Sequence, residues 1–266
     1  MNGNEQVSCA VTDADTDLSR DALLGGRLVI RQPRQGARVA IDTLLLAAAV
    51  PAREGDKVLE LGAGTGAASL ALARRVDGMG VTGIERDPAM VRLANENARL
   101  NHLEDACRFL VGDVARLDPA MHGAFDQVMA NPPHLASACA DAPPDPGRRA
   151  AFVEGRGAPL RSWIAAASLA LRRRGRFTMI HRADRLAEIV AVLIAKGRFG
   201  EVTILPLWPK AGQPARRALI SARKGVKGGA QLLPGLVLHR KDGRFTDEAE
   251  AVLREMAALP LAGRAG

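Results

Sequence analysis

The segment Glu60-Leu61-Gly62-Ala63-Gly64-Thr65-Gly66 lies between an apolar strand pattern and a helical pattern. Glycines at such a turn let the backbone bend sharply and approach a ligand with no Cβ in the way. The following helix also begins with backbone N–H groups that need a partner. The next strand ends at Glu85, where a carboxylate can accept hydrogen bonds from both hydroxyls of a ribose. The spacing predicts a site for a cofactor that contains a nucleoside.

Two cofactor classes fit this turn. Gly62 to Ala67 satisfies the dinucleotide pattern GxGxxG/A, and a plain glycine turn that packs a helix on a strand is a third interpretation. Glu60 would repel a pyrophosphate but suits the cationic amino-acid end of S-adenosylmethionine. Asp113, after the third strand, is placed where an adenine amino group could be bound. These carboxylates favour S-adenosylmethionine over a nicotinamide cofactor.

Asn131-Pro132-Pro133-His134 directly follows the fourth predicted strand, Phe125–Ala130. In open α/β sheets ligands bind outside the carboxyl ends of the strands, so these residues are candidates for substrate contact. Taken alone, the segment could also be a rigid turn that ends a strand.

Together with the glycine turn, this order of motifs resembles the class I S-adenosylmethionine-dependent methyltransferases. Within them it is similar to the small-domain group, which has Asp/Asn-Pro-Pro followed by Tyr, Phe or Trp, and most of all to the bacterial valine-tRNA adenine-N6 methyltransferase family. The likeness extends over roughly residues 25–260. Its weaker supporting segments are Gln32-Pro33, Asp42–Leu46 and Gly243–Thr246.

The resemblance implies a role for each motif residue. The Asn131 side-chain oxygen and the Pro132 carbonyl would hold the two hydrogens of a planar amine, while the prolines fix an extended backbone that points these oxygens inward. His134 stands where the family has a larger aromatic ring that stacks on the target base. Catalysis would then rest on positioning, with no metal and no strong general base. The implied catalytic residues are Asn131, Pro132, Pro133 and His134, and the implied cofactor-binding residues are Glu60, Gly62, Gly64, Gly66, Glu85 and Asp113.

Strands and helices alternate along the chain with short connections, which predicts an α/β fold with a mostly parallel sheet covered on both faces. The resemblance narrows this to the Rossmann-like class I methyltransferase fold with seven strands. We predict a flexible acidic tail over residues 1–24 and a single methyltransferase domain over 25–266. Residues 135–158 show neither a helical nor a strand-like period of apolar residues and are a candidate substrate loop. The predicted strands are 28–30, 57–61, 80–85, 107–111, 125–130, 175–181, 201–207, 217–222 and 236–239, and the predicted helices are 41–50, 67–76, 88–100, 160–171, 185–196 and 247–259.

Positive charge is concentrated in the C-terminal half. Residues 147–266 contain 23 basic and 9 acidic residues, whereas residues 1–146 have a net charge of −6. This asymmetry indicates a polyanionic partner, but an arginine-rich composition also arises from a GC-rich genome, and charge alone leaves both interpretations open. The resemblance implies that the partner is RNA, specifically tRNA. The candidate RNA contacts are Arg148, Arg149, Arg172–Arg174, Arg216, Arg217, Lys224 and Lys227.

The remaining composition excludes several classes. No apolar stretch is long enough for a bilayer span, and no basic-then-apolar leader opens the sequence, so we expect a cytoplasmic protein without a membrane partner. Three scattered cysteines suggest neither a disulfide framework nor a zinc site. We expect a monomeric N-methyltransferase that acts on adenine N6 of a tRNA. The alternatives are a protein glutamine N5-methyltransferase, a DNA adenine methyltransferase and a catalytically weak RNA-binding protein of the same fold.

Overall fold

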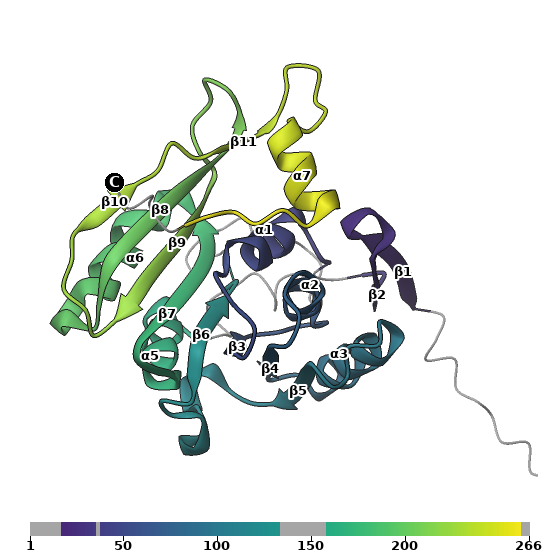
Figure 1. The fold of residues 1–266 in the computed structure, drawn as a ribbon, viewed down its shortest axis with the longest axis horizontal. Coiled ribbons are helices and arrows are strands. Elements are labelled where there is room, and N and C mark those ends of the chain that lie inside the picture. Colours follow the sequence, from purple (N-terminus) through teal and green to yellow (C-terminus); the bar gives the residue numbers. More distant parts are fainter. Residues whose placement is uncertain (1–16, 36–37, 134–157, 262–266) are drawn as a thin grey trace, which may run out of the picture.

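A mostly parallel sheet runs through the centre of the molecule in the computed structural model, which describes residues 17–35, 38–133 and 158–261 (Figure 1). Its strands lie in the order β10-β8-β9-β7-β6-β3-β4-β5, and β11 also pairs with β8. The strands are β1 (Leu18–Leu23), β2 (Leu28–Pro33), β3 (Lys57–Leu61), β4 (Gly80–Glu85), β5 (Cys107–Val111), β6 (Phe125–Ala130), β7 (Leu171–Arg182), β8 (Phe199–Lys210), β9 (Arg217–Lys224), β10 (Ala230–Leu232) and β11 (Leu236–His239). The helices are α1 (Ile41–Ala49), α2 (Ala67–Arg75), α3 (Pro88–Leu100), α5 (Leu160–Ala170), α6 (Leu186–Ile194) and α7 (Asp247–Glu255).

Helices cover both faces of this sheet, as predicted (Figure 1). One apolar cluster joins the sheet to α1, α2, α3 and α7, and a second joins it to α5 and α6. In sheet order, the seven strands β5, β4, β3, β6, β7, β9 and β8 form the mostly parallel sheet that the sequence predicts. Among these seven, only β9 is antiparallel to its neighbours. The α/β prediction is therefore confirmed, and β10 and β11 extend the sheet by pairing along β8.

The central strands have the bounds that the sequence predicts. β3, β4, β5 and β6 begin and end at the predicted residues, and so does α3. β7 begins at Leu171 instead of residue 175, because Leu171 already pairs with Phe125 of β6. The register of the two strands then shifts before Arg176 pairs with Gln127.

The predicted tail boundary at residue 24 is wrong. Leu18–Leu23 forms β1, which pairs antiparallel with β2 in a hairpin, while residues 1–16 lie outside the described residues. Asn97 of α3 and Asn101, the C-cap residue of that helix, bind the free edge of this hairpin. The Asn97 Oδ1 accepts from the Arg31 N–H at 2.8 Å, and the Asn101 Oδ1 accepts from the Val29 N–H at 2.8 Å. Polar residues thus hold β1 and β2 against the domain.

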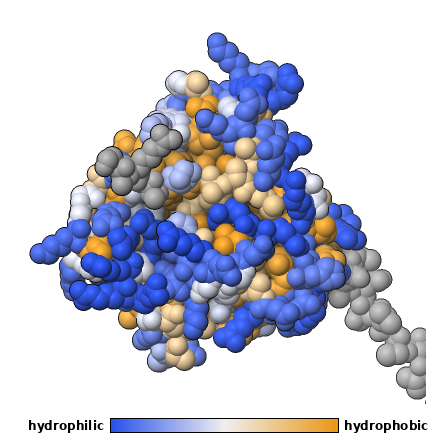
Figure 2. Space-filling view, in the orientation of Figure 1, coloured by the Kyte–Doolittle hydropathy of each residue, from blue (hydrophilic) through white to orange (hydrophobic). Residues whose placement is uncertain are grey.

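The carboxyl ends of the parallel strands meet at one edge of the sheet, called here the carboxyl edge. Leu61 pairs with both Ile84 and Ala130, and Glu85 pairs with Val111, so β3 to β6 end at a similar level. β8 and β11 also end at this edge, and antiparallel β9 begins there. In Figure 2 hydrophilic side chains project at the top of the molecule, over the loop that precedes α7.

The described residues contain no helix long and apolar enough to cross a membrane. They also contain no cluster of three or more His, Cys, Asp or Glu side chains that could hold a metal ion. Cys107 is buried and has a free thiol. The other two cysteines lie outside the described residues.

Candidate active site

The three glycines of the turn serve different purposes. All have positive φ, which favours glycine: 69° at Gly62, 53° at Gly64 and 82° at Gly66. A Cβ on Gly62 would lie 2.6 Å from the Trp163 ring, and one on Gly66 would lie 2.6 Å from the Phe109 ring. Those two glycines therefore allow close packing. At Gly64 no atom of the described residues lies within 4 Å of the Cβ position, so the open side of the turn is at Gly64.

Glu60 lies below this turn and is almost completely buried. Its Oε2 accepts hydrogen bonds from the Ser69 N–H at 3.0 Å and the Ser69 hydroxyl at 2.5 Å. Burial raises the pKa of the Glu60 carboxyl to about 8; the bonds from Ser69 oppose this rise, and the nearby Glu85 adds to it. The site therefore contains a carboxyl group whose charged form is destabilised until a cation approaches. The sequence did not single out Ser69, because only the fold brings it to Glu60.

Glu85 ends β4 and lies against the glycine turn. Its Oε2 accepts from the Gly64 N–H at 3.1 Å, and its Oε1 accepts from the Asp87 N–H at 3.1 Å. The fold thus brings together the open glycine and the carboxylate that the sequence assigned to one ligand. The arrangement suits a ribose, whose two hydroxyls can each donate to a carboxylate.

Asp113 follows β5, the strand next to β4. Its Oδ1 accepts from the Ala115 N–H at 2.8 Å and so begins the short helix Val114–Arg116. The Gly112 N–H donates to the Glu85 carbonyl at 3.0 Å, which fixes the level of Asp113 relative to Glu85. Asp113 and Glu85 therefore occupy neighbouring positions along the carboxyl edge.

Asn131 leaves β6 at this edge, directly after Ala130, the residue opposite Leu61. Its side-chain oxygen is buried and accepts no hydrogen bond from any described residue. Pro132 is buried and Pro133 half-buried, whereas His134 lies outside the described residues. A buried amide oxygen without a partner costs roughly 1–3 kcal/mol, and a ligand N–H at this position would remove that cost.

Trp163 and Asp42 make contacts that the motifs do not predict. Trp163 of α5 packs against Gly62, and its Nε1 donates to the Ala158 carbonyl at 3.0 Å. Asp42, in the first turn of α1, pairs with Arg217 of β9 at 2.8 Å between Oδ2 and Nε. The N-cap of α1 is Ala40, so Asp42 does not cap the helix.

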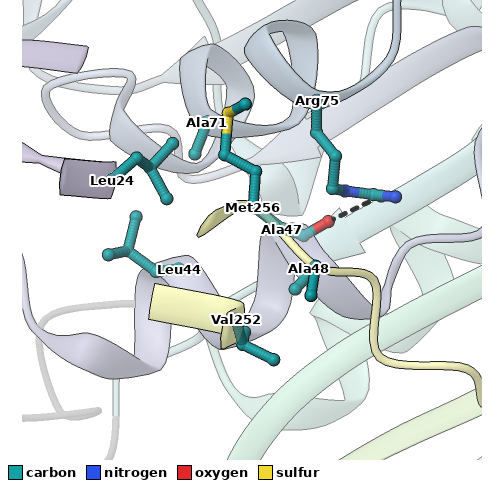
Figure 3. Close-up of a pocket in the computed structure, with 9 residues that line it drawn as sticks. Leu24, Leu44, Ala47, Ala48, Ala71, Arg75, Val252 and Met256 are labelled. Carbon is teal, nitrogen blue, oxygen red and sulfur yellow. Dashed lines mark hydrogen bonds between the residues drawn. The ribbon is translucent and has the colours of Figure 1, made fainter. Parts of the chain in front are cut away.

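A narrow apolar cavity also lies between α1, α2 and α7 (Figure 3). Arg75 of α2 reaches the end of α1 there, and its guanidinium donates to the carbonyls of Ala47 at 3.0 Å and Val50 at 2.7 Å. Burial lowers the pKa of Arg75. None of the residues that line this cavity is a predicted site residue, and its contacts are those of helix packing.

The chain is similar to known methyltransferases in sequence. Residues 36–142 match the family Methyltransferase small domain. Two relatives named tRNA1(Val) (adenine(37)-N6)-methyltransferase come from Actinobacillus succinogenes and Porphyromonas gingivalis. The first is 28% identical over 86% of this chain and 94% of its own length, and the second is 31% identical over 68% and 74%. A release factor glutamine methyltransferase from Rhodospirillum rubrum is 42% identical, over only 32% of this chain and 25% of its own length.

A solved structure shares the fold. The crystal structure of a predicted O-methyltransferase, protein Atu636 from Agrobacterium tumefaciens, superposes with a TM-score of 0.69 at 27% sequence identity. The match covers 82% of this chain and 98% of that one. The likeness therefore extends over most of this chain.

Proposed function

The chain belongs to the methyltransferase small-domain family of class I S-adenosylmethionine-dependent methyltransferases, and from that membership we propose that it methylates N6 of an adenine in a tRNA. The observation that supports a planar amine as acceptor is the buried side-chain oxygen of Asn131, which has no partner among the described residues. The names of the two tRNA methyltransferase relatives support adenine in tRNA as the source of that amine.

The residues at the carboxyl edge fit the cofactor. S-adenosylmethionine supplies an electrophilic methyl group on a positively charged sulfur. The open face of Gly64 leaves room for a ligand, and the Glu85 carboxylate beside it would hold the ribose. Asp113, one strand further, would bind the adenine amino group, and Glu60 would face the cationic amino-acid end.

Asn131 has a specific part in the chemistry. An aromatic amine is a weak nucleophile because its lone pair is delocalised into the ring. When the Asn131 oxygen and the Pro132 carbonyl accept its two hydrogens, the nitrogen can become pyramidal and direct its lone pair at the methyl group. These oxygens act by positioning, which is effective because the strand end and the prolines already fix the backbone.

Replacing Asn131 tests this role. We expect Asn131→Ala to lower kcat at least about tenfold while cofactor affinity is retained, because the lost bonds are to the acceptor. Gln127→Ala is the control, since Gln127 belongs to β6, the strand that Asn131 follows, and its amide oxygen is also buried without a partner among the described residues. Single-turnover rates and cofactor titrations separate the two effects. Equal rates for Asn131→Ala and the wild type would refute the assignment.

A protein glutamine side chain is the second candidate acceptor, favoured by the match to a release factor glutamine methyltransferase. Its planar amide would meet the same two oxygens. Labelled cofactor, incubated with tRNA, ribosomal RNA, DNA and protein fractions from a strain that lacks this gene, separates the candidates. Label in N6-methyladenine of tRNA supports the proposal, and label in protein glutamine overturns it.

A further inference from the structure

The fold sorts the candidate RNA contacts between the two edges of the sheet. Arg172–Arg174 begin β7, and Lys224 ends antiparallel β9, so all of them lie at the edge opposite the site. Arg172 pairs with Asp126, and the Lys224 Nζ donates to the Leu171 carbonyl at 2.6 Å, with its pKa lowered by burial. The prediction of Lys224 as an RNA contact is not supported, because its ammonium group is used inside the fold.

Lys227 also lies near that opposite edge, and Arg148 and Arg149 lie outside the described residues. Arg216 and Arg217 lie at the carboxyl edge, where two loops extend the basic surface. The first loop joins β8 to β9, the second joins β11 to α7, and the Lys210 Nζ connects them by donating to the Lys241 carbonyl at 3.3 Å. Arg217 is held by Asp42. Three cations, Lys210, Arg216 and Lys241, form no ion pair with a described carboxylate, and Arg216 and Lys241 are exposed.

The strand order places these cations on the acceptor side of the site. Along the carboxyl edge, the cofactor residues follow β5, β4 and β3, then comes Asn131 after β6, and then β7, β9 and β8. β8 is three strands from β6, or about 14 Å at the usual spacing of strands. A few nucleotides of an extended strand cover that distance, so a base at Asn131 and phosphates at the loops can belong to one molecule.

A hollow beside the loop that joins β8 to β9 has an aromatic wall. It is lined by Trp208, Ala211, Gly212, Gln213, Pro214 and Val237. The Trp208 Nε1 donates to the Pro234 carbonyl at 3.1 Å, which fixes the ring. Gly235 permits this approach: its φ is 93°, and a Cβ there would lie 2.4 Å from the Trp208 Nε1. Stacking of an unpaired base on an aromatic ring contributes about 1–3 kcal/mol.

Building on the proposed function, we propose that Lys210, Arg216, Lys241 and the Trp208 hollow bind the RNA strand next to the target nucleotide. The cations contact its phosphates, and the hollow takes one flanking base. This gives the RNA a defined path from the loops to Asn131, and it leaves the arginines of the opposite edge without a role in binding.

Charge reversal at the two edges tests the path. The combined variant Lys210→Glu, Arg216→Glu and Lys241→Glu removes the proposed contacts. The variant Arg173→Glu, Arg174→Glu and Lys227→Glu makes the same change in charge with exposed residues near the opposite edge. We expect the first to weaken RNA binding at least about tenfold and to lower the salt slope of log Kd by roughly two, because each phosphate contact contributes about 0.7. The second should bind RNA as the wild type does.

The two tryptophans of the chain provide a direct readout. In Trp163→Phe, Trp208 is the sole fluorophore, and we expect tRNA to quench it. In Trp208→Phe, Trp163 beside Gly62 remains, and we expect it to respond to S-adenosylhomocysteine and not to RNA fragments too short to reach Asn131. If tRNA does not quench Trp208 in the Trp163→Phe variant, the hollow does not bind a flanking base.

The outcomes separate this inference from the proposed function. If both triple variants bind RNA alike, the path is wrong while adenine methylation can still hold. If RNA binds through the carboxyl edge but the label appears in protein, the path holds and the proposed function fails. If the wild type binds no RNA, both are overturned.

Discussion

Glu60 links the electrostatics of the site to pH. Its carboxyl group is buried beside Glu85, and its pKa is raised to about 8 from an ordinary value of 4.5, chiefly by burial. Without a ligand, Glu60 is therefore largely protonated at pH 7. If the cationic end of the cofactor faces it, binding favours the ionised form and releases a proton.

We therefore predict that cofactor affinity increases with pH between about 6 and 7.5, and that binding at pH 7 releases close to one proton, because the released proton is that of Glu60. Glu60→Gln should remove both effects, and Glu104→Gln, at an exposed position, should remove neither. Calorimetry in buffers of different ionisation enthalpy measures the released proton. A wild-type affinity that does not change over this range would contradict the prediction.

The same residue affects stability in a direction fixed by its raised pKa. Between pH 4.5 and 8 the folded state binds a proton that the unfolded state has lost, so this group makes the unliganded protein less stable as pH rises through that window. Glu60→Gln avoids the loss and keeps an oxygen for Ser69 to donate to. We expect it to stabilise the unliganded protein at pH 7 by on the order of 2 kcal/mol, measured by denaturant unfolding.

At the scale of elements, α3 supports both the hairpin and the glycine turn. Asn97 and Asn101 are four residues apart on a helix, or about 6 Å, which matches the separation of Arg31 and Val29 two residues apart on β2. Each amide bonds to the N–H and the carbonyl of its partner, as a neighbouring strand would. Asn97 also donates to the Thr65 carbonyl at 3.0 Å, and so reaches the glycine turn.

These contacts predict a difference between two similar variants. Asn97→Ala and Asn101→Ala should each destabilise the protein by on the order of 2 kcal/mol, because each leaves buried backbone groups unpaired. Only Asn97→Ala should also weaken cofactor binding, since only Asn97 fixes Thr65. Urea unfolding and cofactor titration measure the two effects. Equal losses of cofactor affinity would show that Thr65 needs no such support.

The elements also show what the sequence could predict. β3 to β6 are parallel strands that appear in the sequence as short apolar runs between glycines, prolines and charges, and the sequence predicts their ends to the residue. Because such strands end at one edge, the placement of Glu85, Gly64 and Asn131 along that edge follows from the order of motifs alone. β1 was missed because Ser19, Arg20 and Asp21 interrupt its apolar pattern, and its stability comes from pairing with β2. The contacts of Glu60 with Ser69 and of Asp42 with Arg217 join residues that have no shared motif, so only the fold reveals them.

Across the whole molecule, the uneven charge of the chain divides the carboxyl edge of the sheet into a nearly neutral half and a basic half. The half of the sheet that holds the proposed cofactor residues comes from residues 57–130, where the charge is nearly balanced, and the half beyond Asn131 comes from the strongly basic C-terminal region. Under the proposed function, a cation-bearing cofactor and a polyanionic acceptor therefore approach the site from opposite sides. The basic half attracts the polyanionic acceptor.

One ion pair links the N-terminal helix to the basic half. Asp42 of α1 and Arg217 of β9 are 175 residues apart, and their side chains are 14% and 33% exposed. Partial burial places the coupling above that of a surface pair, at about 1–2 kcal/mol. Asp42→Ala and Arg217→Ala should each destabilise the protein, and the double variant should lose less than the sum, as measured by urea unfolding in a double-mutant cycle. The exchange of the two residues, Asp42→Arg with Arg217→Asp, should recover part of the loss, because it restores opposite charges across the same contact. Fully additive losses would show that α1 and β9 are held together by packing alone.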